Sequence, residues 1–214
     1  MKLEIPGIVD DQAIPERFCF GIPASDGPMQ LGENRNPAIH WSDLPEGTRS
    51  LVLICVDPDV PSVADDVNQE GKSIAKDLPR VDFYHWLMVD IDPGLGEIRE
   101  GSCSEGVTAG GKDSPPGPTG SRQGLNDYTG FMAGNPDMEG QYFGYDGPCP
   151  PWNDERPHRY RFRLIATSLP RLNVDDAFRG PDVEAAIKGH VLGEASITGW
   201  YSLNPAVSDP PAGD

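Results

Sequence analysis

The stretch LVLICVDPDVP, residues 51–61, joins an apolar run to two aspartates set between prolines. Leu51–Val56 is apolar throughout, which is typical of a central strand covered on both faces. Asp57 and Asp59 follow this run, so we expect their carboxylates at the rim of a sheet, where pockets form. The two prolines stiffen the backbone that carries them. Asx turns capped by these aspartates are the plainer alternative.

Other segments repeat the strand pattern, and one segment reads as a helix. Short β-branched or aromatic runs bounded by Pro, Gly or Asp predict strands at Phe18–Phe20, Tyr84–Ile91, Tyr160–Ala166 and Val191–Leu203. In Tyr160–Ala166 the apolar side chains alternate with arginines, which predicts one buried face and one solvated face. Pro181 in the first turn and Gly189 after Val183–Lys188 predict the one convincing helix.

The chain has the length and composition of one β-rich domain with structured loops. Its 214 residues include 25 Gly and 23 Pro, which punctuate strands and turns without reaching the level of low-complexity disorder. Two loops, 62–82 and 108–145, are long enough to be functional. Aromatic residues in the second indicate that it is packed. Residues 205–214 have the composition of a frayed tail.

Charge and cysteine usage limit the function classes. A formal charge of −17 disfavours nucleic acid and anionic membrane surfaces, and no apolar run is long enough for stable membrane insertion. An acidic docking face for a basic protein partner stays open. Cys19, Cys55, Cys103 and Cys149 are dispersed and lack metal-ligand spacing, which favours a reduced, cytoplasmic protein with Cys55 in the core.

Polar motifs recur where other predicted strands begin. His85-Trp86 opens one strand, and the rigid loop Gly147–Pro151 precedes His158-Arg159-Tyr160 at the start of another. Each motif alone is more often a satisfied histidine or a turn. Together they predict one polar pocket, in which the Gly147 N–H is within reach of a ligand.

The order D-P-D-x-P, H-W, G-P-x-P-P and H-R-Y resembles the phosphatidylethanolamine-binding protein family, also called Raf kinase inhibitor-like, in its bacterial branch. The resemblance covers about residues 14 to 203 of a single domain, 1–214. It implies a mainly β fold of two antiparallel sheets in a Greek-key sandwich with a few short peripheral helices. It also implies a pocket for a small anion, phosphate or a phosphorylated headgroup, without a cofactor. Carried over residue by residue, the ligand-binding positions are Asp57, Asp59, His85, Gly147, Pro150, His158 and Tyr160.

The anion pocket needs an account of its aspartates. A like charge about 4 Å away costs roughly 4 kcal/mol at an effective dielectric near 20. We therefore expect Asp57 to face a histidine, so that charged His85 or His158, the Tyr160 hydroxyl and a loop N–H hold the anion. Affinity should then fall as the pH rises past about 7.

Other functions stay open at this point. They are regulation of a partner kinase or protease, hydrolysis by the Asp/His/Tyr pocket, a metal site at Asp57, Asp59 and His85, and pairing into a homodimer. No recognised Ser or Cys nucleophile elbow is present, so we expect a binding protein rather than an enzyme.

Overall fold

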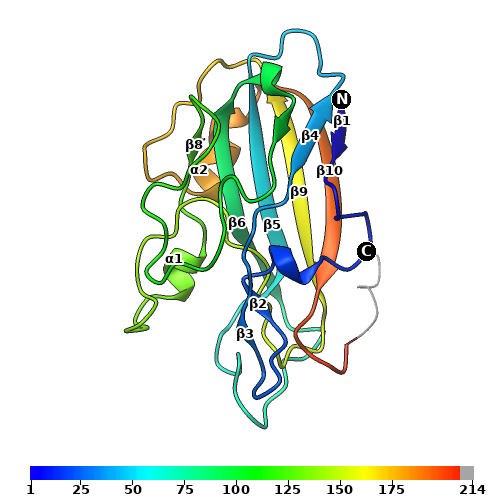
Figure 1. Ribbon diagram of the computed structural model, residues 1–214, viewed down its shortest axis with the longest axis vertical. Coiled ribbons are helices and arrows are strands. Elements are labelled where there is room, and N and C mark those ends of the chain that lie inside the picture. The colour runs from blue at the N-terminus through cyan, green and yellow to red at the C-terminus, as the bar shows by residue number, and fades with distance from the viewer. Residues whose placement is uncertain (208–214) are drawn as a thin grey trace.

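The computed structural model describes residues 1–207, and an antiparallel five-stranded sheet of order β10-β9-β5-β6-β8 forms its centre (Figure 1). Its strands are β5 (Ser50–Pro61), β6 (Arg80–Ile91), β8 (Arg122–Gln123), β9 (His158–Thr167) and β10 (Val191–Tyr201). A second antiparallel sheet joins β1 (Lys2–Glu4), β4 (Ile39–Ser42) and β7 (Glu97–Ile98), and a ribbon pairs β2 (Gly21–Ile22) with β3 (Gln30–Leu31). The helices are α1 (Tyr128–Phe131), α2 (Gly180–Ile187) and two 3-10 turns, Glu16–Phe18 and Pro93–Leu95. The predicted mainly β fold of antiparallel sheets with short helices is confirmed.

Strand β5 is central because both of its faces are apolar. It lies between β9 and β6, and its residues 50–57 are all buried. Leu51, Leu53 and Cys55 pack into the core shared with β4, whereas Val52, Ile54 and Val56 pack with Phe178, Val183 and Ile187. Figure 1 shows the β1-β4 pair in front of the large sheet and α2 behind it. The sheet is therefore covered on both sides, as the apolar run predicts.

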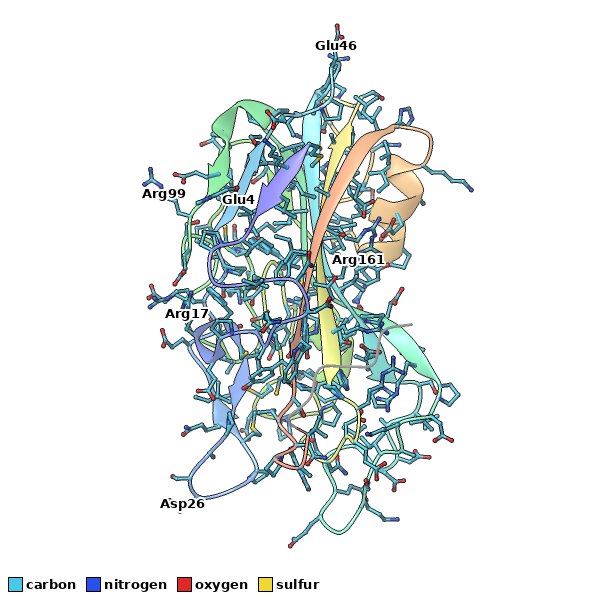
Figure 2. All side chains as sticks on the ribbon, turned by 90° about the vertical axis from the view of Figure 1, so that its right-hand side faces the viewer. Glu4, Arg17, Asp26, Glu46, Arg99 and Arg161 are labelled. Atoms are coloured by element: carbon cyan, nitrogen blue, oxygen red, sulfur yellow. The ribbon has the colours of Figure 1, made fainter. Side chains whose placement is uncertain are left out.

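Strand β9 shows the predicted alternation. Tyr160, Phe162 and Leu164 are fully buried, while Arg161 and Arg163 lie on the other face and pair with Glu194. Arg161 is seen on the outer surface, next to β10, in Figure 2. One face of the strand thus belongs to the core. The first residues of β9 bring polar groups to one end of the sheet.

Strand boundaries near the polar motifs differ from those expected. β5 continues through Asp57 to Pro61, and β6 begins at Arg80, so the connecting loop is shorter than 62–82. The pairing of β5 with β6 shifts register between Asp57 and Val60. A β-bulge bends a strand and redirects its side chains, so the two aspartates lie on an irregular strand end and not beyond it.

One local prediction is wrong, and one short helix is not predicted. Phe18–Phe20 is not a strand: Phe18 ends a 3-10 turn, and the short strand starts at Gly21. Burial of both phenylalanines produces the apolar signal without sheet pairing. The helix α1 lies inside the loop 108–145, where four residues carry too little periodicity to be recognised. The helix expected near Pro181 is confirmed as α2, followed by Gly189 at φ 80°.

Predictions for the long loop, the C-terminal tail and the cysteines concern segments outside the sheets or single side chains. The loop 108–145 is packed, since Tyr128, Tyr142 and Tyr145 are buried. Of the predicted tail 205–214, residues 208–214 lie outside the described residues. Cys19, Cys55, Cys103 and Cys149 are free thiols. No helix within residues 1–207 combines the length and the apolar character needed to cross a bilayer.

Candidate ligand-binding site

A cavity of about 100 Å³ opens where the bulged end of β5, the middle of β6 and the start of β9 meet. We call it the aromatic cavity, because the rings of four Phe and Tyr residues and two histidines line it. Its lining is Asp57, Val60, Pro61, Ala64, Val67, Asn68, Phe83, His85, Tyr128, Phe131, Cys149, Pro150, Pro151, His158 and Tyr160. Five of the seven positions expected from the sequence are therefore brought together here. None of these described lining residues is a lysine or an arginine.

His158 is the positive group of the cavity floor. Its Nδ1 lies 2.7 Å from Asp57 Oδ2, and its Nε2 lies 3.1 Å from Asp154 Oδ2. Because carboxylates only accept, both ring nitrogens donate, and the ring is an imidazolium. Asp154 in turn pairs with the guanidinium of Arg80. A buried chain of alternating charge thus runs Arg80, Asp154, His158, Asp57.

Burial and the two carboxylates act on His158 in opposite directions. Complete burial alone would lower its pKa, but Asp57 and Asp154 outweigh this and raise the pKa to about 9. The expectation that Asp57 faces a histidine is confirmed. The expectation that His158 donates a hydrogen bond to the anion is wrong, since both of its N–H groups are already used. Its role is to neutralise Asp57 beneath the cavity.

His85 has the opposite character. Its Nδ1 lies 2.8 Å from the backbone oxygen of Asp146, so Nδ1 carries a proton and Nε2 is the nitrogen left for a ligand. Burial lowers its pKa, more than nearby Asp57, Asp127 and that carbonyl bond raise it. His85 is therefore a neutral ring whose Nε2 has a lone pair available to a hydrogen-bond donor.

Tyr160 supplies the donor. Its hydroxyl is buried and has no hydrogen-bond partner within residues 1–207, whereas the Tyr128 hydroxyl donates to the Gly147 oxygen at 2.8 Å. The rings of Tyr160 and His85 lie 5.1 Å apart between centroids. The two side chains are therefore neighbours in the lining of the aromatic cavity.

Comparisons with known proteins identify the family. Residues 5–202 match the family model described as "Phosphatidylethanolamine-binding protein". The chain belongs to the phosphatidylethanolamine-binding protein family.

Two curated relatives span nearly the whole chain. A UPF0098 protein of Methanothermobacter thermautotrophicus is 34% identical over 94% of this chain and 98% of its own length. The UPF0098 protein YbhB of Escherichia coli is 29% identical over 94% of this chain and 100% of its own length. The crystal structure of E. coli YbcL, titled a new member of the mammalian PEBP family, has a TM-score of 0.67 at 24% identity and covers 94% of this chain and 97% of its own. Family membership indicates a ligand-binding or regulatory protein in general terms.

In this member of the phosphatidylethanolamine-binding protein family, two expected positions do not line the cavity. The Asp59 carboxylate is fully buried against Arg156 and Arg159, at 2.8 and 2.9 Å. The Gly147 N–H donates to Asn34 Oδ1 at 2.8 Å, and a Cβ at Gly147 would lie 1.9 Å from the Phe18 oxygen. Both are therefore structural: the interpretation of the Gly147 N–H as free for a ligand is wrong.

The alternative metal site is not assembled in this family member. Asp59 is turned toward two arginines and away from Asp57 and His85. Within residues 1–207, no group of three His, Cys, Asp or Glu side chains is placed to hold a metal ion. Pro150 lines the cavity beside Cys149, whose pKa burial raises to about 12.

Sequence reasoning missed several groups that position the site. Asp154 is buried and lies four residues before His158 in a segment with no strand signal. Asp146 holds His85 through its carbonyl, while its carboxylate accepts from Asn34, Lys112 and Asn126 at 2.7, 2.7 and 2.8 Å. A buried carboxylate needs several donors from distant segments, and their convergence is not visible in a local motif.

Proposed function

We propose that this protein binds a small oxyanion, such as phosphate or a phosphorylated headgroup, in the aromatic cavity. The observation that carries the proposal is the Tyr160 hydroxyl. It is buried and unpartnered among the described residues, and it belongs to a residue that lines the cavity. A buried hydroxyl without a partner costs about 1–3 kcal/mol, and an anion oxygen would supply the missing acceptor.

The charge arrangement is compatible with an anion despite the buried aspartates. Asp57 is balanced by the imidazolium of His158 at 2.7 Å, and Asp154 by Arg80. A ligand in the cavity therefore meets a balanced chain and not an isolated carboxylate. This removes most of the roughly 4 kcal/mol that one unpaired like charge would cost about 4 Å away.

Binding is favoured over thiol chemistry by the state of Cys149. The thiolate is the nucleophilic form of cysteine, and a pKa of about 12 keeps Cys149 protonated at neutral pH. Tyr160 is equally unsuited to act as a base, because burial raises its pKa far above the usual value. The Cys149 thiol and the Tyr160 hydroxyl are therefore both neutral groups that can form hydrogen bonds with a ligand.

The proposal is tested by titrating inorganic phosphate into wild type, Tyr160→Phe and Tyr201→Phe, with calorimetry as the readout. Tyr201 is the matched control: its hydroxyl is also buried, it interacts with the Cys19 thiol, and Tyr201 does not line the cavity. We expect Tyr160→Phe to weaken binding roughly tenfold or more, since a hydrogen bond to a charged group contributes about 1.5–3 kcal/mol.

Tyr201→Phe should leave the affinity unchanged. Tyr160→Phe should keep the stability of wild type, because it removes a hydroxyl that lacks a partner among residues 1–207. Equal phosphate affinity in all three proteins, or no detectable binding to wild type, would contradict the proposal.

A further inference from the structure

The neutral ring of His85 restricts what kind of anion fits. The carbonyl of Asp146, 2.8 Å from Nδ1, fixes the proton on that nitrogen. Nε2 has no protein partner among residues 1–207 and belongs to a residue that lines the cavity. An oxyanion that carries no hydroxyl would place a lone pair of its oxygen against the lone pair of His85 Nε2. That contact is repulsive unless a proton lies between the two atoms.

Groups packed around His85 do not supply this proton. His158 on β9 is charged, but Asp57 and Asp154 take both of its protons. The Tyr128 hydroxyl donates to Gly147, and the Tyr160 hydroxyl is needed by the anion itself. The protonated Cys149 thiol also lines the cavity, but an S–H group is only a weak donor.

The charged groups that act on His85 are Asp57 from β5 and Asp127 and Asp146 from the loop that contains α1. These carboxylates favour a protonated ring, but burial outweighs them and the pKa stays below its ordinary value. No lysine or arginine lines the described cavity wall to supply a proton or a second positive charge. The proton must therefore come with the ligand or be taken from water.

We propose that the cavity selects an oxyanion bearing its own hydroxyl, which donates to His85 Nε2 while another oxygen of the same group accepts from Tyr160. Hydrogen phosphate and the protonated form of a phosphomonoester have this hydroxyl. Sulfate and phosphodiesters lack it, and they bind only when His85 takes up a proton. This inference rests on the proposed anion site and specifies which oxyanions that site prefers.

Phosphate and sulfate provide the matched pair of probes. At about pH 8 both are tetrahedral and mostly doubly charged, and they differ by one hydroxyl. We expect wild type to bind phosphate at least roughly tenfold more tightly than sulfate, since an unmet buried acceptor costs about 1–3 kcal/mol. The difference should narrow toward about pH 5, as His85 begins to carry the proton itself.

Two variants test the acceptor, His85 Nε2, and the donor, the Tyr160 hydroxyl, independently of each other. His85→Gln presents an amide that can donate or accept, so the preference for phosphate over sulfate should disappear. Tyr160→Phe removes a donor that serves both anions, so both affinities should fall while their ratio is kept. Circular dichroism and thermal unfolding confirm that each variant is folded before its affinities are compared.

Esterified phosphate is compared with the free ion by adding methyl phosphate at about pH 5, where methyl phosphate and inorganic phosphate both carry a hydroxyl. Tighter binding of methyl phosphate than of inorganic phosphate would identify a headgroup as the source, and the reverse would identify the free ion. Equal wild-type affinity for phosphate and sulfate at about pH 8 would overturn the selectivity but leave anion binding intact. Absence of binding to either would overturn both.

Discussion

Among the individual side chains, His158 carries the clearest pH dependence of stability. Its pKa is raised from 6.5 to about 9 by Asp57 and Asp154 against the effect of burial. A raised pKa in the folded state means that the stabilisation is fully present below about pH 6.5 and is lost as the pH rises through about 9. The difference amounts to on the order of 3 kcal/mol.

Denaturant unfolding at about pH 6, 7.5 and 9 measures this effect. We expect the free-energy advantage of wild type over His158→Gln to shrink steadily over this range. His40→Gln is the control, because His40 is half-exposed and lies 3.6 Å from Glu97. An advantage that does not change between pH 6 and pH 9 would mean that His158 is not held as an imidazolium.

The sequence identifies these side chains better than it identifies their partners. Asp57, His85, His158 and Tyr160 meet as predicted, because each lies on a strand whose apolar pattern fixes which side faces inward. Which histidine is charged could not be predicted. That depends on Asp154 and on the Asp146 carbonyl, which come from irregular segments without a repeating pattern.

At the level of elements, the Asn153 side chain makes several of the hydrogen bonds that hold the loop between β5 and β6. The Asn153 side chain donates to the carbonyls of Asp66 and Lys72 at 2.8 and 3.2 Å and accepts from the Asn68 N–H at 3.0 Å. Asn68 lines the aromatic cavity, so this loop forms part of its wall. The packing explains why a polar loop without periodicity is nevertheless ordered.

Replacing Asn153 should loosen this loop. We expect Asn153→Ala to lower the free energy of unfolding by about 2 kcal/mol, because it leaves several backbone groups without partners. Hydrogen exchange should accelerate in residues 66–74 more than elsewhere. Asn135→Ala, at an exposed site in the α1 loop, is the control. Unchanged exchange in residues 66–74 of Asn153→Ala would show that other contacts hold the loop.

Element prediction succeeded where burial is periodic and failed where it is not. Residues 51–56, 84–91 and 160–166 all lie inside observed strands. The ends of β5 and β6 were missed because a bulge at Asp57 to Val60 keeps the strands paired through a proline-rich stretch. At Phe18–Phe20 the apolar signal came from burial in a turn, which a strand pattern cannot distinguish.

For the molecule as a whole, the formal charge of −17 should oppose folding. Self-repulsion of a strongly charged chain is larger in the compact state, and salt screens it as the Debye length falls from about 30 Å at 0.01 M to a few Å near 1 M. We expect Tm to rise with sodium chloride over this range. Calorimetry in potassium chloride checks that the effect is general. A falling Tm would show that surface ion pairs outweigh the repulsion.

The segment at residues 10–14 pairs with the far end of the chain. The Asp10 carboxylate accepts from the Thr198 N–H at 2.7 Å, across 188 positions, and the Ile14 N–H donates to the Trp200 oxygen at 2.8 Å. During synthesis, the early segment has no partner until the ribosome has added Trp200. Closing so long a loop is slow. Until then Ile14, which is buried in the folded protein, stays exposed on the nascent chain. The last strand therefore sets when this protein can first become native.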